Sequence, residues 1–240
     1  MKRIFLEKIT DELTISGADA NHLARSLRAR RGDKITAVDG AGNCAILELI
    51  DFDKETIKAR RISTMQKVLV ERKITLADCL PKQSRLDNII EKATELGVDK
   101  IEPLISERTI VRIGGARAES RLERWQRIAK EAAEQCARDT IPQIAEVRTL
   151  DEWLRSLPPP DDTLLLFCWE GEQSTTVREV LSRNIDKNII VLIGPEGGFT
   201  EREVAKIVVS GGVSVTLGKR ILKTDTAAIS VLAMINYESM

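Results

Sequence analysis

The hydrophobic pattern of this chain changes near residue 70, and this change limits the possible folds more than any other feature. Residues 1–70 contain short apolar alternations separated by turn signals, at a spacing of about ten residues that is typical of a small β-barrel or sandwich. After residue 70, apolar strand candidates alternate with helical periodicities, which predicts an α/β domain with a mostly parallel sheet. We therefore expect two domains, 1–70 and 71–240, joined near residues 63–71.

Each expected element follows from an apolar run or from a helix signal. The expected strands of the first domain are 34–38, 44–50 and 56–62, with turns at 39–42 and 51–53. Those of the second are 74–80, 100–105, 163–169, 188–193 and 213–217. The expected helices begin near a capping residue at Ser84, cover 119–137, begin at the T-x-x-E capping box of Thr200, and cover 227–235.

Residue usage excludes several classes of protein. His22 is the only histidine, and the four cysteines are separated by 32 residues or more. We therefore expect no metal site, because zinc ribbons and two-histidine centres need closer or more numerous ligands. No apolar run approaches the roughly 20 residues that span a bilayer, and the charged N-terminus is unlike a secretory signal. We expect a cytoplasmic protein that does not bind membranes.

The first glycine-containing loop follows a strand in the segment NIIVLIGPEGGFT, residues 188–200. Such loops lie beyond the carboxyl ends of strands, where open α/β sheets bind ligands. The spacing fits neither a dinucleotide fingerprint nor a phosphate-binding P-loop. Because Pro195 lacks an N–H group and Glu196 would repel phosphate, an uncharged or cationic ligand is favoured. The alternative is a tight turn that binds nothing.

A second such loop occurs in VTLGKRILKTDTA, residues 215–227, where a strand passes through Gly218 into a polar turn and an apolar helix. If the strands before the two loops are neighbours, the loops face one another across a crevice that could hold a small ligand. Arg220 and Lys223 would then lie at its rim. In the alternative they are ordinary surface charges.

Two groups of basic residues are candidates for phosphate contacts. Five cationic side chains lie within ten residues of one another in the first domain, namely Arg25, Arg28, Arg30, Arg31 and Lys34. Lys82 and Arg85 follow the first strand of the second domain. Such density suits nucleic acid, although the 37 basic and 37 acidic residues give no net charge. The alternatives are a solvated face and a salt-bridged surface.

Several segments, taken together, resemble one family over essentially the whole chain. They are IEKATELGVDKIEPLISERT, RWQRIAKEAAEQCAR, IGPEGGFTEREV and LGKRILKTDTAAISVLAMI, in this order behind HLARSLRARRGDKI. The chain resembles the bacterial 16S ribosomal RNA uracil-N3 methyltransferases of the SPOUT superfamily. This resemblance implies an α/β fold with a C-terminal SPOUT-type trefoil-knotted α/β domain and a small N-terminal PUA-like RNA-binding β-barrel. It also implies a homodimer, S-adenosylmethionine as cofactor, and methylation of uridine 1498 of 16S rRNA in the small ribosomal subunit.

The resemblance also implies which residues bind the cofactor. The residues that match the family's motifs are Glu170, Ile193, Gly194, Pro195, Gly197, Gly198, Leu217, Gly218, Ile221, Leu222 and Thr224. Lys223 stands where the family usually has arginine, and Asp225 stands where it usually has glutamate. For RNA binding we assign the basic residues already named, which are Arg25, Arg28, Arg30, Arg31, Lys34, Lys82 and Arg85.

The implied reaction places demands on the site, because uracil N3 carries a proton that must leave before a methyl group can be added. We expect Arg220 or Lys223 to stabilise the uracil anion. Glu196 or Asp225 would orient the base or accept its proton. The competing hypotheses are methylation of another RNA position such as a ribose 2′-oxygen, a catalytically silent RNA-binding assembly factor, and a nucleotide-dependent enzyme.

Overall fold

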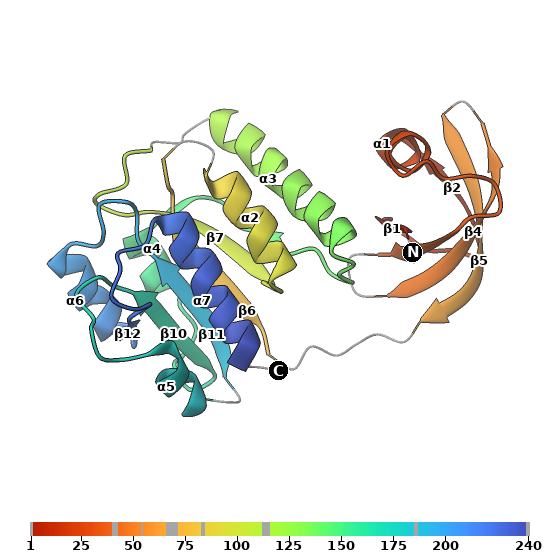
Figure 1. Cartoon of the computed structure of the whole chain (residues 1–240). Coiled ribbons are helices and arrows are strands. Elements are labelled where there is room, and N and C mark those ends of the chain that lie inside the picture. The colour runs from red at the N-terminus through yellow and green to blue at the C-terminus, as the bar shows by residue number, and fades with distance from the viewer. Residues whose placement is uncertain are drawn as a thin grey trace. The chain divides into compact units, whose positions relative to one another are not determined.

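The computed structural model describes residues 2–39, 43–53, 55–65, 72–82, 85–111, 116–184 and 187–238 (Figure 1). The chain divides into two compact units. The first consists of Met1–Leu69 with Ala133–Ile141, and the second of Val70–Ala132 with Pro142–Met240. Most of the expected interdomain linker, residues 66–71, lies outside the described residues.

The first unit is built on a five-stranded sheet with the order β1-β3-β4-β5-β2. Its strands are β1 (Lys2–Phe5), β2 (Glu12–Ser16), β3 (Lys34–Val38), β4 (Cys44–Phe52) and β5 (Thr56–Met65). β1 and β3 are parallel, and the other pairs are antiparallel. Helix α1 (Gly17–Asn21) and a π-helical turn (His22–Ser26) follow β2, and Ala20 and Leu23 lie in the apolar core of the unit.

The three strands expected in this unit are confirmed, and two others were not expected. The expected turn at 51–53 is wrong in part, because Asp51 and Phe52 belong to β4 and pair with Lys58 and Ile57. The pairing register shifts between Leu49 and Asp51, so an irregularity carries the strand into the polar residues instead of ending it. Residues 40–42 of the other expected turn lie outside the described residues.

The segment Ala133–Ile141 packs within the first unit. Ala133 shares a small apolar cluster with Phe5, Val38 and Cys44. The backbone N–H of Phe5 donates to Glu134 Oε1 at 3.1 Å, and Arg3 forms an ion pair with Asp139. The first unit is therefore assembled from two separate stretches of the sequence.

The second unit contains a fully parallel sheet with the order β12-β10-β11-β6-β7-β8, and β9 also pairs with β7. The strands are β6 (Ile74–Cys79), β7 (Lys100–Ile105), β8 (Gln143–Ile144), β9 (Arg148–Thr149), β10 (Thr163–Cys168), β11 (Asn188–Ile193) and β12 (Val213–Val215). All five expected strands are confirmed, three of them one or two residues shorter at the C-terminal end. Their carboxyl ends share one edge, where parallel sheets bind ligands.

Helices cover both faces of this sheet (Figure 1). They are α2 (Arg85–Glu95), α3 (Ala116–Gln135), α4 (Leu150–Arg155), α5 (Val177–Ser182), α6 (Glu201–Val209) and α7 (Thr224–Glu238). Ala77 and Cys79 of β6 pack in one core with Trp153 of α4 and Ile207 of α6. Because alternate residues of a strand point to opposite faces, Asp78 points to the other face, where α2 and α7 contact each other and α7 contacts β11.

The local helix signals explain most helix boundaries. The expected capping box of α6 is present, with Thr200 as its N-cap. α3 begins three residues before its expected start, and Ala137 beyond its end has a left-handed φ of 62°. The expected cap of α2, Ser84, lies outside the described residues. Of the helices that the structure describes, none has the length and apolar character needed to cross a membrane.

Candidate active site

A pocket of about 750 Å³ lies at the carboxyl edge of the parallel sheet, within the size range of small-molecule sites. Its lining comes from three segments, 168–173 after β10 except Gly171, 193–199 after β11 except Gly197, and 215–224 after β12, together with Ala227 of α7. The two glycine-containing loops therefore share one pocket, although their strands are not neighbours, since β10 lies between β11 and β12. Ten residues expected to bind a cofactor line it: Glu170, Ile193, Gly194, Pro195, Gly198, Leu217, Gly218, Ile221, Leu222 and Thr224.

The glycine-containing loop after β11 is closely packed. A Cβ atom at Gly194 would lie 3.1 Å from the ring of Phe199, and Gly198 has a φ of 67°. The N–H group of Gly198 donates to the carbonyl oxygen of Pro195 at 2.9 Å. A side chain at residue 194 would thus require the Phe199 ring to shift, and Gly198 adopts a left-handed backbone that glycine tolerates without strain.

Residues from two other strand ends anchor this loop. Glu196 Oε1 accepts hydrogen bonds from the backbone N–H of Lys82 at 2.9 Å and from Arg85 Nη1 at 3.2 Å. Arg108 Nη1 donates to the carbonyl oxygen of Gly197 at 2.7 Å. Gly197, the eleventh residue expected to bind a cofactor, is thus held by Arg108 and does not line the pocket among the described residues.

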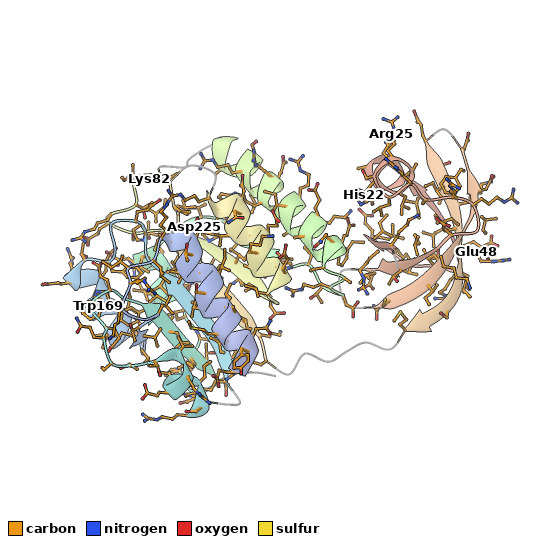
Figure 2. All side chains as sticks on the ribbon, in the orientation of Figure 1. His22, Arg25, Glu48, Lys82, Trp169 and Asp225 are labelled. Carbon is orange, nitrogen blue, oxygen red and sulfur yellow. The ribbon has the colours of Figure 1, made fainter. Side chains whose placement is uncertain are left out.

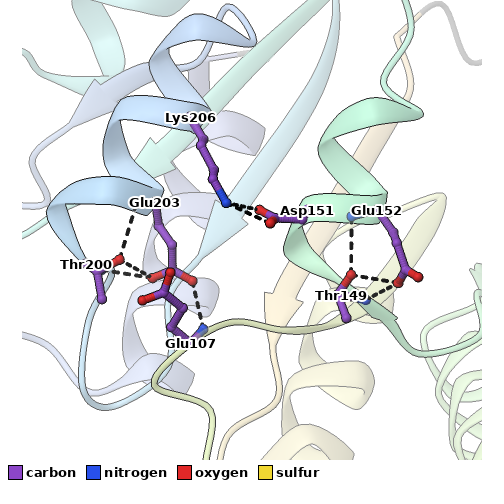
Figure 3. Close-up of polar contacts among 7 residues, drawn as sticks. All are labelled: Glu107, Thr149, Asp151, Glu152, Thr200, Glu203 and Lys206. Atoms are coloured by element: carbon purple, nitrogen blue, oxygen red, sulfur yellow. Dashed lines mark hydrogen bonds and ion pairs between the residues drawn. The ribbon is translucent and has the colours of Figure 1, made fainter.

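A buried carboxylate, Glu203, fixes the end of the same loop (Figure 3). Glu203 is only 2% exposed, and its Oε2 accepts from the N–H of Thr200 at 2.9 Å and from its hydroxyl at 3.1 Å. Its Oε1 accepts from the N–H of Glu107 at 2.8 Å. The capping box expected from sequence therefore also joins the loop after β7 to the loop after β11.

The segment after β10 is organised by Glu172, which sequence reasoning missed. Its Oε1 accepts from the N–H groups of Ser174 and Thr175 at 2.9 and 3.0 Å, and its Oε2 accepts from the hydroxyl of Ser214 at 2.7 Å. These bonds, first that from Ser214, lower the pKa of Glu172 to about 2. In the same segment, burial raises the pKa of the Cys168 thiol to about 12, so this thiol is neutral.

The turn after β12 is more exposed to solvent than the loop after β11. Lys219, Arg220 and Lys223 are solvent-exposed, and Ile221 is 84% exposed although it lines the pocket. Gly218 has a φ of 109° and donates to Thr216 Oγ1 at 3.2 Å. Within the described part of the chain, neither Arg220 nor Lys223 has an ion-pair partner. Both cationic groups are thus open to solvent at the pocket.

Two buried polar groups have no hydrogen-bond partner among the described residues: Asp78 and the hydroxyl of Thr224, which lines the pocket. Asp78 is fully buried in β6 and pairs in register with Ile193. Burial, and next the charges of Glu196 and Asp225, raise the pKa of Asp78 well above its usual range. Figure 2 shows Asp225 where α7 begins. Sequence reasoning did not select Asp78, which looks like any acid near a strand end.

The basic segment of the first unit presents all five of its expected side chains to solvent, those of Arg25, Arg28, Arg30, Arg31 and Lys34. The backbone of Arg28 has a left-handed φ of 48°. The N–H of Arg30 donates to Asp33, which also pairs with Lys2 at 2.7 Å. His22, labelled in Figure 2, lies 3.9 Å from Glu134. The five charges therefore lie on one short exposed segment that is fixed at Asp33.

Among the described residues, no three histidine, cysteine, aspartate or glutamate side chains are placed to hold a metal ion. The expected absence of a metal stays a prediction.

Comparisons with known protein families cover both units. A family model described as an RNA methyltransferase domain matches residues 70–236. A model described as an RNA methyltransferase PUA domain matches residues 15–60. The fold class expected from the sequence is thus confirmed, with a SPOUT-type α/β domain behind a PUA-like domain.

Curated relatives and solved structures agree with these matches. Ribosomal RNA small subunit methyltransferase E of Bacillus subtilis is 31% identical, over 100% of this chain and 97% of the relative. That of Synechocystis is 36% identical, over 93% and 72%. The crystal structure of the Neisseria gonorrhoeae protein of this name, bound to S-adenosyl methionine, is 32% identical with a TM-score of 0.87, over 99% and 97% of the two chains.

A putative methyltransferase from Legionella pneumophila, solved with bound cofactor SAM, also has a TM-score of 0.87, at 27% identity over 98% and 97% of the two chains. These matches cover at least 93% of this chain in sequence and at least 98% in structure. The chain therefore belongs to the ribosomal RNA small subunit methyltransferase E family of RNA methyltransferases.

Proposed function

We propose that this protein transfers a methyl group from S-adenosylmethionine to N3 of uridine 1498 in 16S rRNA of the small ribosomal subunit. It acts in the cytoplasm as a homodimer, in which residues 1–70 bind RNA and residues 71–240 carry out the transfer. The observation that carries this proposal is the single pocket shared by the loops after β10, β11 and β12. Relatives that match this chain over nearly full length bind the same cofactor.

The residues of the pocket fit this cofactor. S-adenosylmethionine carries a cationic sulfur and no phosphate, and the pocket presents the carboxylates of Glu170, Glu172 and Glu196. The buried hydroxyl of Thr224 lacks a partner in the described structure, so a polar ligand group would satisfy it. When bound, the cofactor supplies the methyl group on its sulfonium. The backbones of the two glycine-containing loops would hold its adenosine.

The exposed cations at the pocket rim, Arg220 and Lys223, are suited to contact the uracil of the RNA substrate. Removal of the N3 proton leaves negative charge on the uracil oxygens, which Arg220 or Lys223 would stabilise. Glu196 is fixed by Lys82 and Arg85, so it orients the substrate through a carboxylate that is already in position. Glu196 and Asp225 are the two candidates for accepting the proton, and the positioning of N3 at about 3–3.5 Å from the methyl group would dominate the rate.

A methylation assay tests the activity. Small ribosomal subunits that lack the modification are incubated with labelled S-adenosylmethionine, and the methylated nucleotide is mapped by mass spectrometry. We expect 3-methyluridine at one position. Methylation of a ribose oxygen would identify a different SPOUT activity, and a chain that ignores the cofactor in calorimetry would be a silent RNA-binding module. Tight binding of ATP or NAD would instead support the hypothesis of a nucleotide-dependent enzyme.

The role of Arg220 is tested by Arg220→Ala, with Arg202→Ala on the exposed side of α6 as the matched control. We expect Arg220→Ala to lose methyl transfer and to keep cofactor binding, while Arg202→Ala keeps both. Near-normal turnover of Arg220→Ala would remove this arginine from the mechanism.

RNA docking by the basic segment is tested through its salt dependence. The double variant Arg28→Ala/Arg31→Ala should weaken RNA binding and make the slope of log affinity against log salt shallower by roughly 0.7–0.9 for each lost phosphate contact. Arg60→Ala serves as the control, since Arg60 in β5 is exposed but paired with Glu48 at 3.1 Å. If the double variant leaves the slope unchanged, the segment is only solvated.

A further inference from the structure

Asp78 is the most unusual polar residue of the second unit. Its side chain is completely buried, and neither carboxyl oxygen has a hydrogen-bond partner among the described residues. Buried polar groups in folded proteins are almost always satisfied, so an orphaned carboxyl group calls for an explanation. Ile193, its neighbour in β11, and Pro103, its neighbour in β7, offer no side-chain donor.

The position of Asp78 connects it to the pocket. Ile193 lines the pocket and continues directly into the glycine-containing loop. Asp78 points to the sheet face on which α7 lies, and α7 begins at Thr224, whose buried hydroxyl also lacks a partner among the described residues. Thr224 lines the cavity, and Asp78 is the strand partner of Ile193, which also lines it, so each orphaned group belongs to or adjoins the pocket lining.

The charges that act on Asp78 are both negative. They come from Glu196 in the loop after β11 and from Asp225 in α7. The cation at the start of α2, Arg85, is paired with Glu196. Lys219, Arg220 and Lys223 also line the pocket but are exposed, and solvent screens their charges far more than it screens a buried carboxyl group. Among the described residues, the buried side of the site thus lacks a cation.

We propose that Asp78 is a specificity-determining residue that holds a proton in the empty site, releases it when the cationic methyl donor binds, and regains it when the neutral product remains. This inference rests on the function proposed above. Binding breaks the O–H bond of the Asp78 carboxyl group, and its proton passes to the solvent buffer. The sulfonium then balances the new carboxylate, and no oxidant or further reactant is needed.

The physical basis is the response of a carboxyl group to a nearby cation. A positive charge favours the ionised form, and weak screening in a protein interior makes this effect larger than in water. Once the methyl group has left, the sulfur is a neutral thioether and no longer favours the carboxylate. Asp78 therefore strengthens the binding of the donor relative to the product, which favours product release.

The sign of the pH dependence follows from this exchange. Because donor binding releases a proton, donor affinity rises with pH between the pKa of Asp78 in the donor complex and its higher pKa in the empty site. A shift of one pKa unit corresponds to a tenfold change in affinity. We therefore expect a gain of about tenfold in donor affinity across this window, and a nearly flat profile for the product.

Calorimetric titration of the full-length protein tests the proposal. S-adenosylmethionine and S-adenosylhomocysteine are titrated between about pH 6 and pH 9, in two buffers that differ in ionisation enthalpy, so that proton release is counted directly. Asp78→Asn, an isosteric change that cannot ionise, should abolish the release and the pH dependence. Asp151→Asn is the control, because Asp151 pairs with Lys206 at 2.6 Å in helices packed on the opposite face of the sheet.

The outcomes separate this proposal from the proposed function. Donor binding without proton release, equal release by donor and product, or release that survives in Asp78→Asn would overturn the role of Asp78 and leave the methyltransferase proposal intact. A protein that binds neither ligand at any pH would overturn both. Should Asp78→Asn fail to fold, the comparison of donor with product on the unmodified protein still decides the question.

Discussion

The two glycine-containing walls of the pocket are held in different ways. The loop after β11 is anchored at Glu196, Gly197 and Thr200 by groups from the loops after β6 and β7 and from α6. The turn after β12 has a local bond between Gly218 and Thr216, and it leaves Ile221 almost fully exposed. The first wall is thus set before a ligand arrives, whereas the second is free to adjust to it.

This difference separates two roles that a pocket wall can have. A wall fixed by hydrogen bonds needs little ordering on binding, which favours affinity. A wall with few contacts belongs to the part of a protein that opens most easily. Substitutions in the anchors of the first wall should therefore change the stability of the fold, and substitutions in the second should change ligand binding alone.

The largest expected effect is that of Glu203→Ala, which removes the buried anchor of the first wall. The N–H groups of Thr200 and Glu107 would lose a charged acceptor, and such losses cost about 2–3 kcal/mol. We expect the melting temperature to fall by roughly 5–10 °C. Glu152→Ala is the control, since Glu152 closes the same T-x-x-E motif in α4 (Figure 3) but is exposed, and its carboxylate bonds only to Thr149 among the described residues. If the two variants lowered the melting temperature equally, the hydrogen bond from Glu107 to Glu203 would add nothing to the stability of the fold.

The next largest effect is expected for Ile221→Ser, a substitution in the second wall. Surface changes away from packed features alter stability by less than about 0.5 kcal/mol, so the melting temperature should stay the same. Affinity for S-adenosylmethionine should fall by roughly three- to tenfold, because the apolar contact with the ligand is lost. Val209→Ser is the control, since Val209 is 88% exposed and lies on α6 outside the pocket lining. A large drop in melting temperature would contradict the contrast between the walls.

A smaller effect is expected for Arg108→Ala, which frees the carbonyl oxygen of Gly197. Arg108 is exposed, so its hydrogen bond contributes only about 0.5–1.5 kcal/mol. Calorimetry should show a loss of cofactor affinity of a few-fold, with a shift in melting temperature of only a few degrees. Arg108→Lys retains a donor and should recover part of the affinity. An affinity equal to that of the parent protein would mean that the first wall does not need this anchor.

The smallest effect concerns Glu172, which organises the segment after β10 that also lines the pocket. Its pKa is lowered from 4.5 to about 2 in the fold. Its contribution to stability is therefore complete above pH 4.5 and disappears as the pH falls toward 2. The difference in melting temperature between the parent protein and Glu172→Gln should shrink over this acidic range. A difference that is constant with pH would show that the ionised form is not what the bonds stabilise.

The sequence was sufficient to predict the parallel sheet and most of its helices, because buried strands such as 100–105 and 188–193 are continuous apolar runs bounded by polar residues. β1 was harder to find, since it places only Ile4 and Phe5 in the interior. The T-x-x-E boxes at Thr149 and Thr176 are equally local signals, and a search for them would have predicted α4 and α5.

The pocket itself was predictable in part. Glycine and proline mark a loop locally, so both glycine-containing loops stand out in the sequence. The anchors do not, because Glu203 and Glu107 are 96 residues apart and Arg108 and Gly197 are 89 residues apart. No local pattern pairs them, and only the order of the strands brings them together. The isolation of Asp78 is likewise a property of the packed sheet.

The first unit contains two separate stretches of the chain, and this has a practical consequence for expressing the second unit by itself. An expression clone that begins at residue 71 would omit Phe5 and Arg3 but keep Ala133 and Asp139, their partners in the first unit. The truncated polypeptide would carry a short stretch with newly uncovered apolar surface and unpaired charge, and such stretches favour self-association. A clean separation of the two halves would require redesign of the residues around Ala133–Ile141 as well as removal of the N-terminal part.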